Sequence, residues 1–231
     1  MIEGILFDKD GTLVDFNATW LPAYRTVTAD LSDGDVALAE RLLRAGGVDP
    51  DSGRFAAGSM FAVGPISDIA DVWRPLLAER ARPDLATAVI DGLAAATLDH
   101  CRALPGAAGL LERLAARGLK LGVATNDGER GTRAMLAKLD LTSRLDFIAG
   151  WDSGFAAKPA PDMVQGFCDA TGLAASAVMV VGDSAADLKM ARGAGAGHCV
   201  GVLSGVCGWD ELGPHADTII DSIATLEELL P

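Results

Sequence analysis

Short runs of apolar residues, each followed by small or acidic residues, recur along this chain. Runs of this kind without polar alternation are typical of strands that are buried on both faces of a parallel sheet. The sequence therefore predicts parallel strands at residues 4–7, 120–124, 147–149, 177–181 and 198–202.

Helical patterns fill the intervals between these runs. Residues 107–117 place Leu110, Leu111 and Leu114 on one face, and the pattern ends at Gly118, a residue type that often terminates helices. A second helix is expected over residues 128–139, and a short closing helix over the ending SIATLEELLP. The alternation of strand and helix indicates βαβ units and hence an α/β fold.

Residues 16–99 interrupt this alternation. They show no convincing strand pattern, only helical patterns such as 33–45 and 84–98, with a glycine-rich stretch between Gly46 and Gly64 that favours a long loop or short broken helices. The LPG motif at 104–106 marks the return to the βα pattern. We therefore predict a discontinuous α/β domain, residues 1–15 and 100–231, and an all-helical insertion at 16–99.

The composition and net charge of the chain limit the kinds of partner that it can bind. The chain has 231 residues, 50% of them hydrophobic and 22% charged, as expected of a folded protein. Its net charge of −13 disfavours nucleic acid and anionic membranes as partners. The four cysteines form no CxxC pair, so we expect reduced thiols. Neither a secretory signal nor an apolar run long enough for a membrane helix is visible, which predicts a cytoplasmic protein.

Polar residues follow the predicted strands at the points where the strands end. Because ligands bind at the carboxyl ends of parallel strands, we expect these residues to converge on one edge of the sheet. They are Asp8 and Asp10 after the first strand, Thr125 and Asn126 after the second, Lys158 after the third, and Asp183, Ser184 and Asp187 after the fourth.

The carboxylates in this set predict a cation site. Asp8 and Asp10 are two residues apart and can share a pocket, while Asp183 and Asp187 are expected on one face of a helix, where its dipole favours their charge. Several carboxylates with one lysine suggest Mg²⁺, which prefers oxygen ligands. Strand alternation would point Lys9 away from the aspartates, so we interpret it as structural, with an electrostatic role at the site entrance as the alternative.

Each motif also has a simpler interpretation when taken alone. Asp10 and Gly11 can form a turn, and the GDS sequence at 182–184 can be a helix N-cap. Turn formers and caps do not explain why DKDGT, ATN, KP and GDSAAD occur in that order, each after a predicted strand. The motifs together therefore favour a catalytic site.

Taken together, these motifs resemble those of the haloacid dehalogenase superfamily. Its phosphatase branch carries DxDGT, a strand-terminal Thr or Ser, a Lys, and a GDxxxD ending, and the resemblance covers essentially the whole chain. It implies a Rossmann-like parallel sheet flanked by helices, with the insertion forming a helical cap of the C1 type. It also implies Mg²⁺ as cofactor and a small phosphorylated metabolite as substrate.

The resemblance implies a role for each core residue. Asp8 would be the nucleophile that forms an aspartyl-phosphate, and Asp10 would be the acid and base. Thr125 and the backbone around Asn126 would hold a phosphoryl oxygen, and Lys158 would neutralise charge on the nucleophile and the transferring group.

The same resemblance implies the metal ligands and their support. Asp183, Asp8 and the backbone carbonyl of Asp10 would bind the metal, and Asp187 would act through water or by orienting Lys158. Supporting residues would be Ser184, together with Gly11 and Thr12, which would shape the turn linking core and cap.

Several members of the superfamily fit less well. Dehalogenases usually lack the second aspartate, which is present here as Asp10, and phosphonatases need a cap lysine, whereas every lysine here lies outside residues 16–99. The pattern is most similar to phosphoglycolate phosphatases, whose substrate is a small phosphorylated carboxylate. Arg54 would then be the candidate for binding the second anionic group, and Trp20 would either cover the substrate or hold the cap helices together.

Other functions stay open at this point. A sugar phosphomutase of the same fold is the nearest enzyme alternative, and a catalytically silent phosphate-binding scaffold is the second. A receiver domain also uses an Asp, a Thr and a Lys on a parallel sheet, but it is shorter and lacks DxDGT. Either a monomer or a homodimer is compatible with the sequence.

Overall fold

The computed structural model describes residues 1–49, 51–56, 58–63 and 66–230. The chain forms two compact units. The first consists of Met1–Asp15 and Arg102–Pro231, and the second of Phe16–Cys101. Within the first unit Val14 forms a bridge with Ala103, and Asp15 N donates a hydrogen bond to Arg102 O (2.8 Å). The segment that leaves the first unit at Asp15 and the segment that returns to it at Arg102 are therefore hydrogen-bonded to each other.

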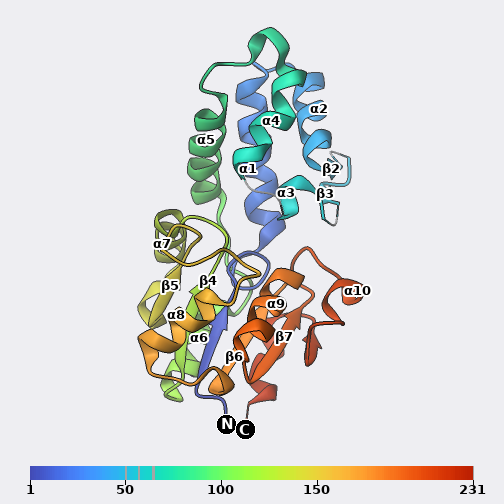
Figure 1. Ribbon diagram of the computed structural model, residues 1–231. Coiled ribbons are helices and arrows are strands. Elements are labelled where there is room, and N and C mark those ends of the chain that lie inside the picture. Colours follow the sequence, from blue (N-terminus) through green and yellow to red (C-terminus); the bar gives the residue numbers. More distant parts are fainter. Residues whose placement is uncertain (50, 57, 64–65, 231) are drawn as a thin grey trace. The chain divides into compact units, whose positions relative to one another are not determined.

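A six-stranded sheet forms the centre of the first unit (Figure 1). All neighbouring strands are parallel. The order is β5 (Phe147–Ala149), β4 (Lys120–Ala124), β1 (Gly4–Phe7), β6 (Val178–Gly182), β7 (His198–Val202) and β8 (Thr218–Ile220). Phe7 at the end of β1 pairs with Val123 on one side and Val181 on the other. The carboxyl ends of β4, β1 and β6 are therefore immediate neighbours.

The predicted strands are present, with two differences. β6 begins at Val178, one residue later than predicted, and includes Gly182. β8, a three-residue edge strand, was not predicted. Its residues are only half-buried and too few to show a periodicity, so the sequence pattern does not separate them from a loop.

Helices cover both faces of this sheet. Strand side chains alternate between two hydrophobic clusters: Ile5 and Phe7 belong to one, and Leu6 to the other. The first cluster includes residues of α6 (Ala107–Ala116), α7 (Glu129–Lys138) and η4 (Ile223–Leu229), and the second includes residues of α8 (Asp162–Thr171), α9 (Ala185–Ala194) and α10 (Trp209–Leu212). The closing helix expected at the C-terminal end is η4, a 3₁₀ helix. Short 3₁₀ turns η2 (Thr142–Arg144) and η3 (Ala175–Ala177) precede β5 and β6.

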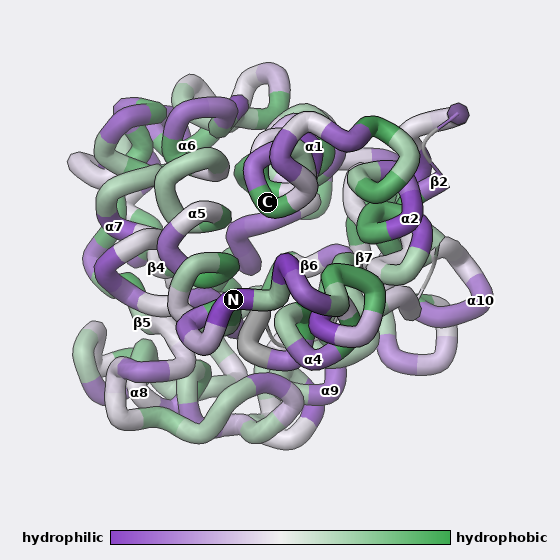
Figure 2. The backbone as a smooth tube through the Cα atoms, turned by 90° about the horizontal axis from the view of Figure 1, so that it is seen from above, coloured by the Kyte–Doolittle hydropathy of each residue, from purple (hydrophilic) through white to green (hydrophobic). Residues whose placement is uncertain are grey.

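The second unit is built mainly from helices. Its longer helices in the described part are α1 (Phe16–Leu31), α2 (Val36–Gly46), α4 (Ile66–Leu77) and α5 (Leu85–His100). Both α1 and α4 pack against α2 and α5. Hydrophilic and hydrophobic residues alternate along helices such as α2 in Figure 2, as expected where one face is buried. The short α3 (Met60–Val63) and η1 (Ala78–Arg80) complete this unit.

α2 begins three residues later than the pattern predicted. Asp33 and Gly34 both have positive φ values, 50° and 80°, which end the preceding turn rather than start a helix. Asp35 is the N-cap, and its side chain accepts a hydrogen bond from Leu38 N (3.1 Å). The helix ends at Gly46, and its C-cap Gly47 has a φ of 98°, a conformation that suits glycine.

The prediction that the insertion contains no strand is wrong. Two two-residue strands, β2 (Val48–Asp49) and β3 (Arg54–Phe55), pair antiparallel in the glycine-rich stretch. Strands of this length carry no alternation that a sequence pattern can reveal. Position 50 and positions 57 and 64–65 of this stretch lie outside the described residues.

Aromatic rings form the centre of the second unit. The rings of Tyr24 and Phe61 are stacked with centroids 3.7 Å apart, and the Trp73 indole donates a hydrogen bond to Leu42 O (2.9 Å). Trp20 is buried and its ring lies 6.2 Å from that of Phe16 and 5.7 Å from that of Tyr24. Trp20 is therefore part of this aromatic core. Among the described residues, no helix is long and apolar enough to cross a membrane.

Candidate active site

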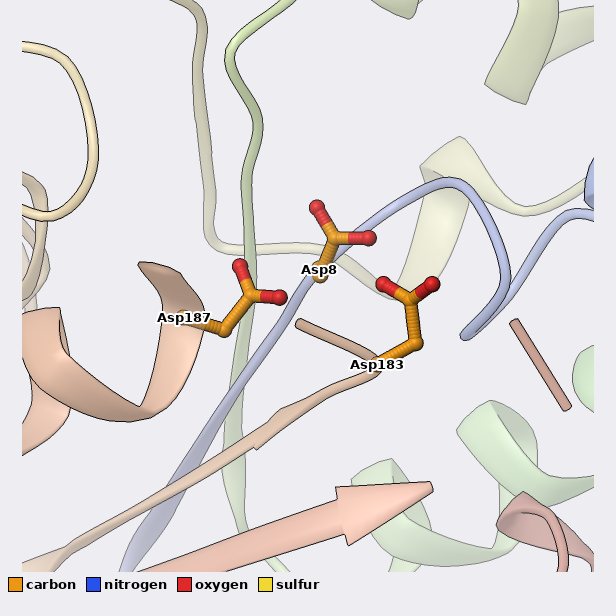
Figure 3. Close-up of side chains that lie close together, drawn as sticks. All are labelled: Asp8, Asp183 and Asp187. Atoms are coloured by element: carbon orange, nitrogen blue, oxygen red, sulfur yellow. The ribbon is translucent and has the colours of Figure 1, made fainter. Parts of the chain in front are cut away.

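Three buried carboxylates lie together at the carboxyl ends of β1 and β6. Asp8, Asp183 and Asp187 each place one carboxylate oxygen so that these atoms are all within 4.8 Å of one another. Figure 3 shows Asp187 on the first turn of a helix and Asp183 on the segment that precedes it. Asp8 continues the pairing of β1 with β6, since its backbone N donates to Val181 O (2.8 Å). Strand order therefore brings together residues that are far apart in sequence.

Asp183 does not lie on the helix. α9 begins at Ala185 and its N-cap Ser184 has an extended backbone, so the prediction that Asp183 and Asp187 share a helical face is wrong. The N-cap residue separates the two, because a cap has non-helical dihedral angles. Asp183 instead lies between the last residue of β6, Gly182, and the N-cap Ser184. Its Oδ2 accepts a hydrogen bond from Val206 N (2.8 Å).

Asp187 is fixed by a capping box at the start of α9. Its Oδ2 accepts hydrogen bonds from Ser184 N (3.0 Å) and Ser184 Oγ (2.6 Å), while Asp187 N donates to Ser184 Oγ (3.3 Å). Its other oxygen, Oδ1, accepts from Lys158 Nζ at 2.5 Å. Both oxygens of Asp187 are therefore occupied by protein donors.

Lys158 lies at the centre of this group. Its ammonium donates to Asp8 Oδ1 at 2.6 Å and to the backbone oxygen of Ala124 at 3.1 Å, in addition to Asp187. Asn126 holds the backbone of Lys158 from both sides: its Oδ1 accepts from Lys158 N (2.8 Å), and its Nδ2 donates to Lys158 O (3.2 Å). The side chain of Asn126 thereby fixes the position of the lysine, a role that the sequence did not reveal.

Burial dominates the electrostatics of the carboxylates. It raises the pKa of Asp8 to about 7, although Lys158 acts in the opposite direction and Asp187 adds to the increase. Burial and the nearby charges of Asp8 and Asp187 also raise the pKa of Asp183 well above its usual range. Burial alone would lower the pKa of Lys158, but Asp187 and Asp8 raise it instead, so this lysine is charged. The group thus has more negative charge than one ammonium balances.

The donor set fits a hard divalent cation. Carboxylate oxygens are the ligands such ions prefer, and a second positive charge would offset the burial and the carboxylate repulsion that together raise the pKa values of Asp8 and Asp183. The prediction named Asp8, Asp183 and the backbone carbonyl of Asp10. The carboxylate cluster has Asp187 as its third member, but both oxygens of Asp187 already accept hydrogen bonds. Asp8 and Asp183 are the carboxylates best suited to bind a metal directly.

Thr125 lies at the end of β4, next to this group. Its backbone N donates to Ala149 O (3.0 Å), and its Oγ1 accepts a hydrogen bond from Asp127 N (3.2 Å). A hydroxyl group that accepts from one side still has a hydrogen to donate. Thr125 therefore has a hydrogen available for a bound anion, and its phosphoryl-binding role stays a prediction.

The prediction that Lys9 points away from the aspartates is wrong. Its side chain is buried, and its ammonium forms ion pairs with Asp10 and, at 2.8 Å, with Asp127 Oδ2. β1 ends at Phe7, and the chain then turns, with both Leu13 N and Val14 N donating to Lys9 O. Strand alternation does not extend through this turn, so it gave the wrong direction relative to Asp10.

Gly11 and Thr12 occupy the turn after Asp10. Gly11 has a φ of 79°, and a Cβ atom added there would lie 2.5 Å from Asp183 Oδ2. The glycine is therefore required both by the backbone conformation and by the close approach of a candidate metal ligand. Thr12 is completely buried.

The loop after β7 is a further part of the site that the sequence analysis missed. Ser204 Oγ donates to Gly11 O (2.7 Å), and Val206 N donates to Asp183 Oδ2. The intervening Gly205 leaves room for Asp183, because a Cβ at that position would overlap its side chain. The sequence signal was a serine and a glycine that follow the predicted strand 198–202 after a single intervening residue, Leu203.

Two predicted specificity residues belong to the second unit. Arg54 is exposed in β3, and Trp20 is buried among aromatic rings. Their assignment to the substrate stays a prediction.

Comparison with known proteins agrees with these motifs. The model of the haloacid dehalogenase-like hydrolase family matches residues 2–195. A phosphoglycolate phosphatase of Rhodospirillum rubrum is 34% identical over 197 residues, covering 84% of this chain and 77% of that protein. An N-acetylmuramic acid 6-phosphate phosphatase of Pseudomonas putida is 27% identical over 194 residues, covering 84% of this chain and 80% of that protein.

Solved structures show the same fold. A crystal structure described as a predicted phosphoglycolate phosphatase from Haemophilus somnus superposes with a TM-score of 0.74 at 21% identity, covering 100% of this chain and 98% of that one. A putative β-phosphoglucomutase from Thermotoga maritima gives a TM-score of 0.73 at 21% identity, with 99% and 98% covered.

This chain belongs to the haloacid dehalogenase-like hydrolase family. Within the family it is a phosphatase, a hydrolase that acts on phosphoric monoesters.

Proposed function

We propose that this protein is an Mg²⁺-dependent phosphatase that hydrolyses a small phosphorylated metabolite through an aspartyl-phosphate on Asp8. The observation that carries this proposal is the position of Lys158, whose ammonium lies 2.6 Å from Asp8 Oδ1 and is held by Asp187. A fixed positive charge beside a buried carboxylate is suited to a reaction in which negative charge approaches that carboxylate.

Asp8 is the nucleophile in this mechanism. A carboxylate oxygen of Asp8 attacks phosphorus, the bond between phosphorus and the ester oxygen breaks, and the phosphoryl group is transferred to Asp8. Lys158 offsets the charge that accumulates, and Thr125 donates a hydrogen bond to a phosphoryl oxygen. The backbone after Thr125, around Asn126, offers further donors at the same place.

Asp10 moves the protons. In the first step it protonates the departing ester oxygen, so the alcohol leaves as a neutral molecule. In the second step the ionised Asp10 removes a proton from water, which attacks the phosphorus of the aspartyl-phosphate. This releases inorganic phosphate, restores the Asp8 carboxylate and returns a proton to Asp10.

Asp8, Asp183 and the backbone carbonyl of Asp10 would hold Mg²⁺. The ion would supply positive charge that neutralises the phosphoryl oxygens and the crowded carboxylates. The raised pKa values of Asp8 and Asp183 support this, because burial and the neighbouring carboxylates disfavour the ionised forms, which a bound cation would favour.

2-Phosphoglycolate is the best candidate substrate. The relative from Rhodospirillum rubrum that is 34% identical carries the name phosphoglycolate phosphatase. This substrate has a carboxylate besides its phosphate, and Arg54, exposed in the second unit, is the candidate to bind it. The burial of Trp20 among aromatic rings favours its packing role over contact with substrate.

We further propose a cytoplasmic protein that acts as a monomer or a homodimer on a small molecule. The net charge of −13 makes nucleic acid and anionic membranes poor partners. Light scattering after size-exclusion chromatography would give the oligomeric state.

Phosphate release from a panel of small phosphomonoesters tests the proposal. The panel is assayed with Mg²⁺ or with chelator, for the unaltered protein and for Asp8→Asn. We expect release that requires Mg²⁺, is lost in Asp8→Asn, and is fastest for 2-phosphoglycolate. Activity spread over the panel would retain the mechanism and reject the substrate.

The same panel separates the two alternatives. Phosphoryl transfer to a sugar that outcompetes water would identify a phosphomutase instead. If no ester releases phosphate and no sugar accepts it, the catalytic proposal is rejected in favour of a silent phosphate-binding scaffold.

A further inference from the structure

The side chain of Lys9 is one of the most deeply buried charged groups in the first unit. Only 1% of the residue is exposed, and its ammonium contacts the carboxylate of Asp10 and, at 2.8 Å, that of Asp127. The sulfur of Met135 lies 3.8 Å from the same nitrogen. Neither Lys9 nor Asp127 has a role in the mechanism given above.

Burying an ammonium group costs several kcal/mol unless it is well paired. At position 9 this cost is offset by the ion pairs with Asp10 and Asp127. Burial would lower the pKa of Lys9, but Asp10 and Asp127 raise it above its ordinary value. The ammonium of Lys9 therefore joins two carboxylates that lie on different loops, one after β1 and one after β4.

Asp127 is itself tied to the phosphoryl-binding part of the site. Its backbone N donates to Thr125 Oγ1 (3.2 Å), and its backbone O accepts from Trp151 N (3.1 Å). Although burial acts to raise the pKa of Asp127, Lys9 lowers it below its ordinary value. Asp127 is thus an ionised anchor that is fixed relative to Thr125.

We propose that Lys9 and Asp127 are positioning residues that orient Asp10 for proton transfer. This inference rests on the proposed function. The ammonium of Lys9 holds Oδ2 of Asp10 and is itself held by Asp127, which lies on the loop after β4. Holding one oxygen of a carboxyl group fixes its rotation, and with it the direction of the second oxygen. The pair thereby sets the geometry of Asp10 relative to a phosphoryl group bound at Thr125.

A purely stabilising ion pair would behave differently from a positioning pair. Loss of stability would affect every substrate to the same extent. In the first step, which releases the leaving group, loss of proton transfer from Asp10 would slow only esters whose leaving group must be protonated. Leaving-group dependence therefore distinguishes the two roles.

The test compares single-turnover release of the leaving group from 2-phosphoglycolate and from 4-nitrophenyl phosphate. The first ester has a basic alkoxide leaving group, whereas nitrophenolate leaves without protonation. For Lys9→Met and for Asp127→Asn we expect a loss of at least about tenfold with 2-phosphoglycolate, and of less than about threefold with 4-nitrophenyl phosphate. Asp10→Asn should show the same selectivity with a larger loss.

A matched control comes from a second lysine and aspartate pair. Lys120 Nζ lies 2.9 Å from Asp146 Oδ1 at the partly exposed start of β4. Lys120→Met removes the same charge by the same substitution, and it should leave the ratio of the two rates unchanged. Mg²⁺ affinity and thermal unfolding, measured for every variant, report on the metal site and on folding.

The outcomes separate the inference from the function on which it rests. An active parent protein whose Lys9→Met and Asp127→Asn variants lose both rates equally, or neither, would overturn the inference alone. A parent protein that cleaves no ester overturns the proposed function and the inference with it. Should Lys9→Met fail to fold, Asp127→Asn decides the question, since its side chain is 29% exposed and the amide keeps its shape.

Discussion

Lys158 Nζ donates a 2.5 Å hydrogen bond to Asp187 Oδ1 between two buried side chains. Asp187 is in turn fixed by the capping box with Ser184 at the start of α9. The N-terminus of one helix thus determines where the ammonium of Lys158 lies, and this ammonium is 2.6 Å from Asp8. A motif that caps a helix also sets the position of a catalytic charge.

Asp187→Asn tests this coupling. The amide keeps the shape of the side chain but removes the charge that orients Lys158. We expect kcat to fall by about 10- to 100-fold, the range typical of residues that orient a ligand or catalytic group. Steady-state phosphate release with saturating Mg²⁺ measures the change.

Ser184→Ala is the control for the capping role. It removes the N-cap hydroxyl and should lower the free energy of unfolding by about 1 kcal/mol. Because Ser184 N still donates to Asp187, kcat should fall less than in Asp187→Asn. Equal kcat values for Asp187→Asn and the unaltered protein would contradict the coupling.

The approach of Gly11 to Asp183 gives a second prediction. An alanine Cβ at position 11 would lie 2.5 Å from Asp183 Oδ2 and 2.7 Å from the Cα atom of Gly205. Gly11→Ala must displace Asp183, so we expect Mg²⁺ affinity to fall by about tenfold or more. Titration calorimetry with Mg²⁺ measures it.

Gly118→Ala isolates the effect of backbone conformation. Gly118 has a φ of 82°, close to the 79° of Gly11, but a Cβ there would meet no atom within 4 Å. Gly118→Ala should cost about 1 kcal/mol of stability because alanine disfavours positive φ, and Gly11→Ala should cost more because it adds the close contacts. Only Gly11→Ala should weaken Mg²⁺ binding, and equal affinities in the two variants would refute the steric explanation.

Much of this site could be predicted because each motif directly follows a strand. The apolar runs predicted β1, β4, β5 and β7 with their observed bounds. The rule that parallel strands place ligands at their carboxyl ends then grouped Asp8 with Asp183 and Lys158. Strand periodicity and motif order carry this information without any knowledge of side-chain packing.

What the sequence did not reveal depends on local geometry beyond the strands. The orientation of Lys9 was wrong because β1 ends at Phe7, and Asp183 was placed on a helix that begins two residues later, at Ala185. The hydrogen bonds from Asn126 to the backbone of Lys158 join loops after two different strands. Hydrophobic periodicity predicts strands and helices, but it carries no information about side-chain contacts in the turns where these elements end.

The third prediction concerns Thr12 and asks whether the hydroxyl of this motif residue contributes to activity or stability. Its side chain is fully buried, and within the described part of the chain its Oγ1 has no hydrogen-bond partner. Valine has the same shape without a polar group to desolvate. Thr12→Val should therefore keep kcat within about twofold and leave stability unchanged or raise it by about 1 kcal/mol. Urea unfolding monitored by circular dichroism gives the stability.

Thr97→Val serves as the comparison for Thr12→Val. Thr97 is also buried, but its Oγ1 donates to Leu93 O at 2.7 Å. The same substitution there should lower the free energy of unfolding by about 1 kcal/mol, because it removes the hydrogen bond between the Thr97 hydroxyl and Leu93 O. A larger loss at Thr12 than at Thr97 would mean that the Thr12 hydroxyl has a structural role.

The last prediction is that ionised Asp183 destabilises the metal-free protein, although the same carboxylate is needed to bind the metal. Burial and neighbouring charges raise its pKa well above the usual value, so folding disfavours the ionised form. For an acid with a raised folded pKa, the cost appears as pH rises above the unfolded value of about 4 and increases until the folded group ionises. In the metal-free protein at pH 8, Asp183→Asn removes this cost while its amide oxygen still accepts from Val206 N.

We therefore expect Asp183→Asn to raise the melting temperature in chelator at pH 8, and to raise it less at pH 5, where folding retains more of the proton on Asp183. Mg²⁺ should stabilise the unaltered protein by mass action, by an amount that grows with the logarithm of its concentration, and should have little effect on the variant. Thermal unfolding at both pH values, with and without Mg²⁺, measures all four quantities. A variant that is less stable than the unaltered protein in chelator at pH 8 would mean that Asp183 is retained for folding. The expected pattern instead identifies a carboxylate that the fold tolerates only because a cation binds to it.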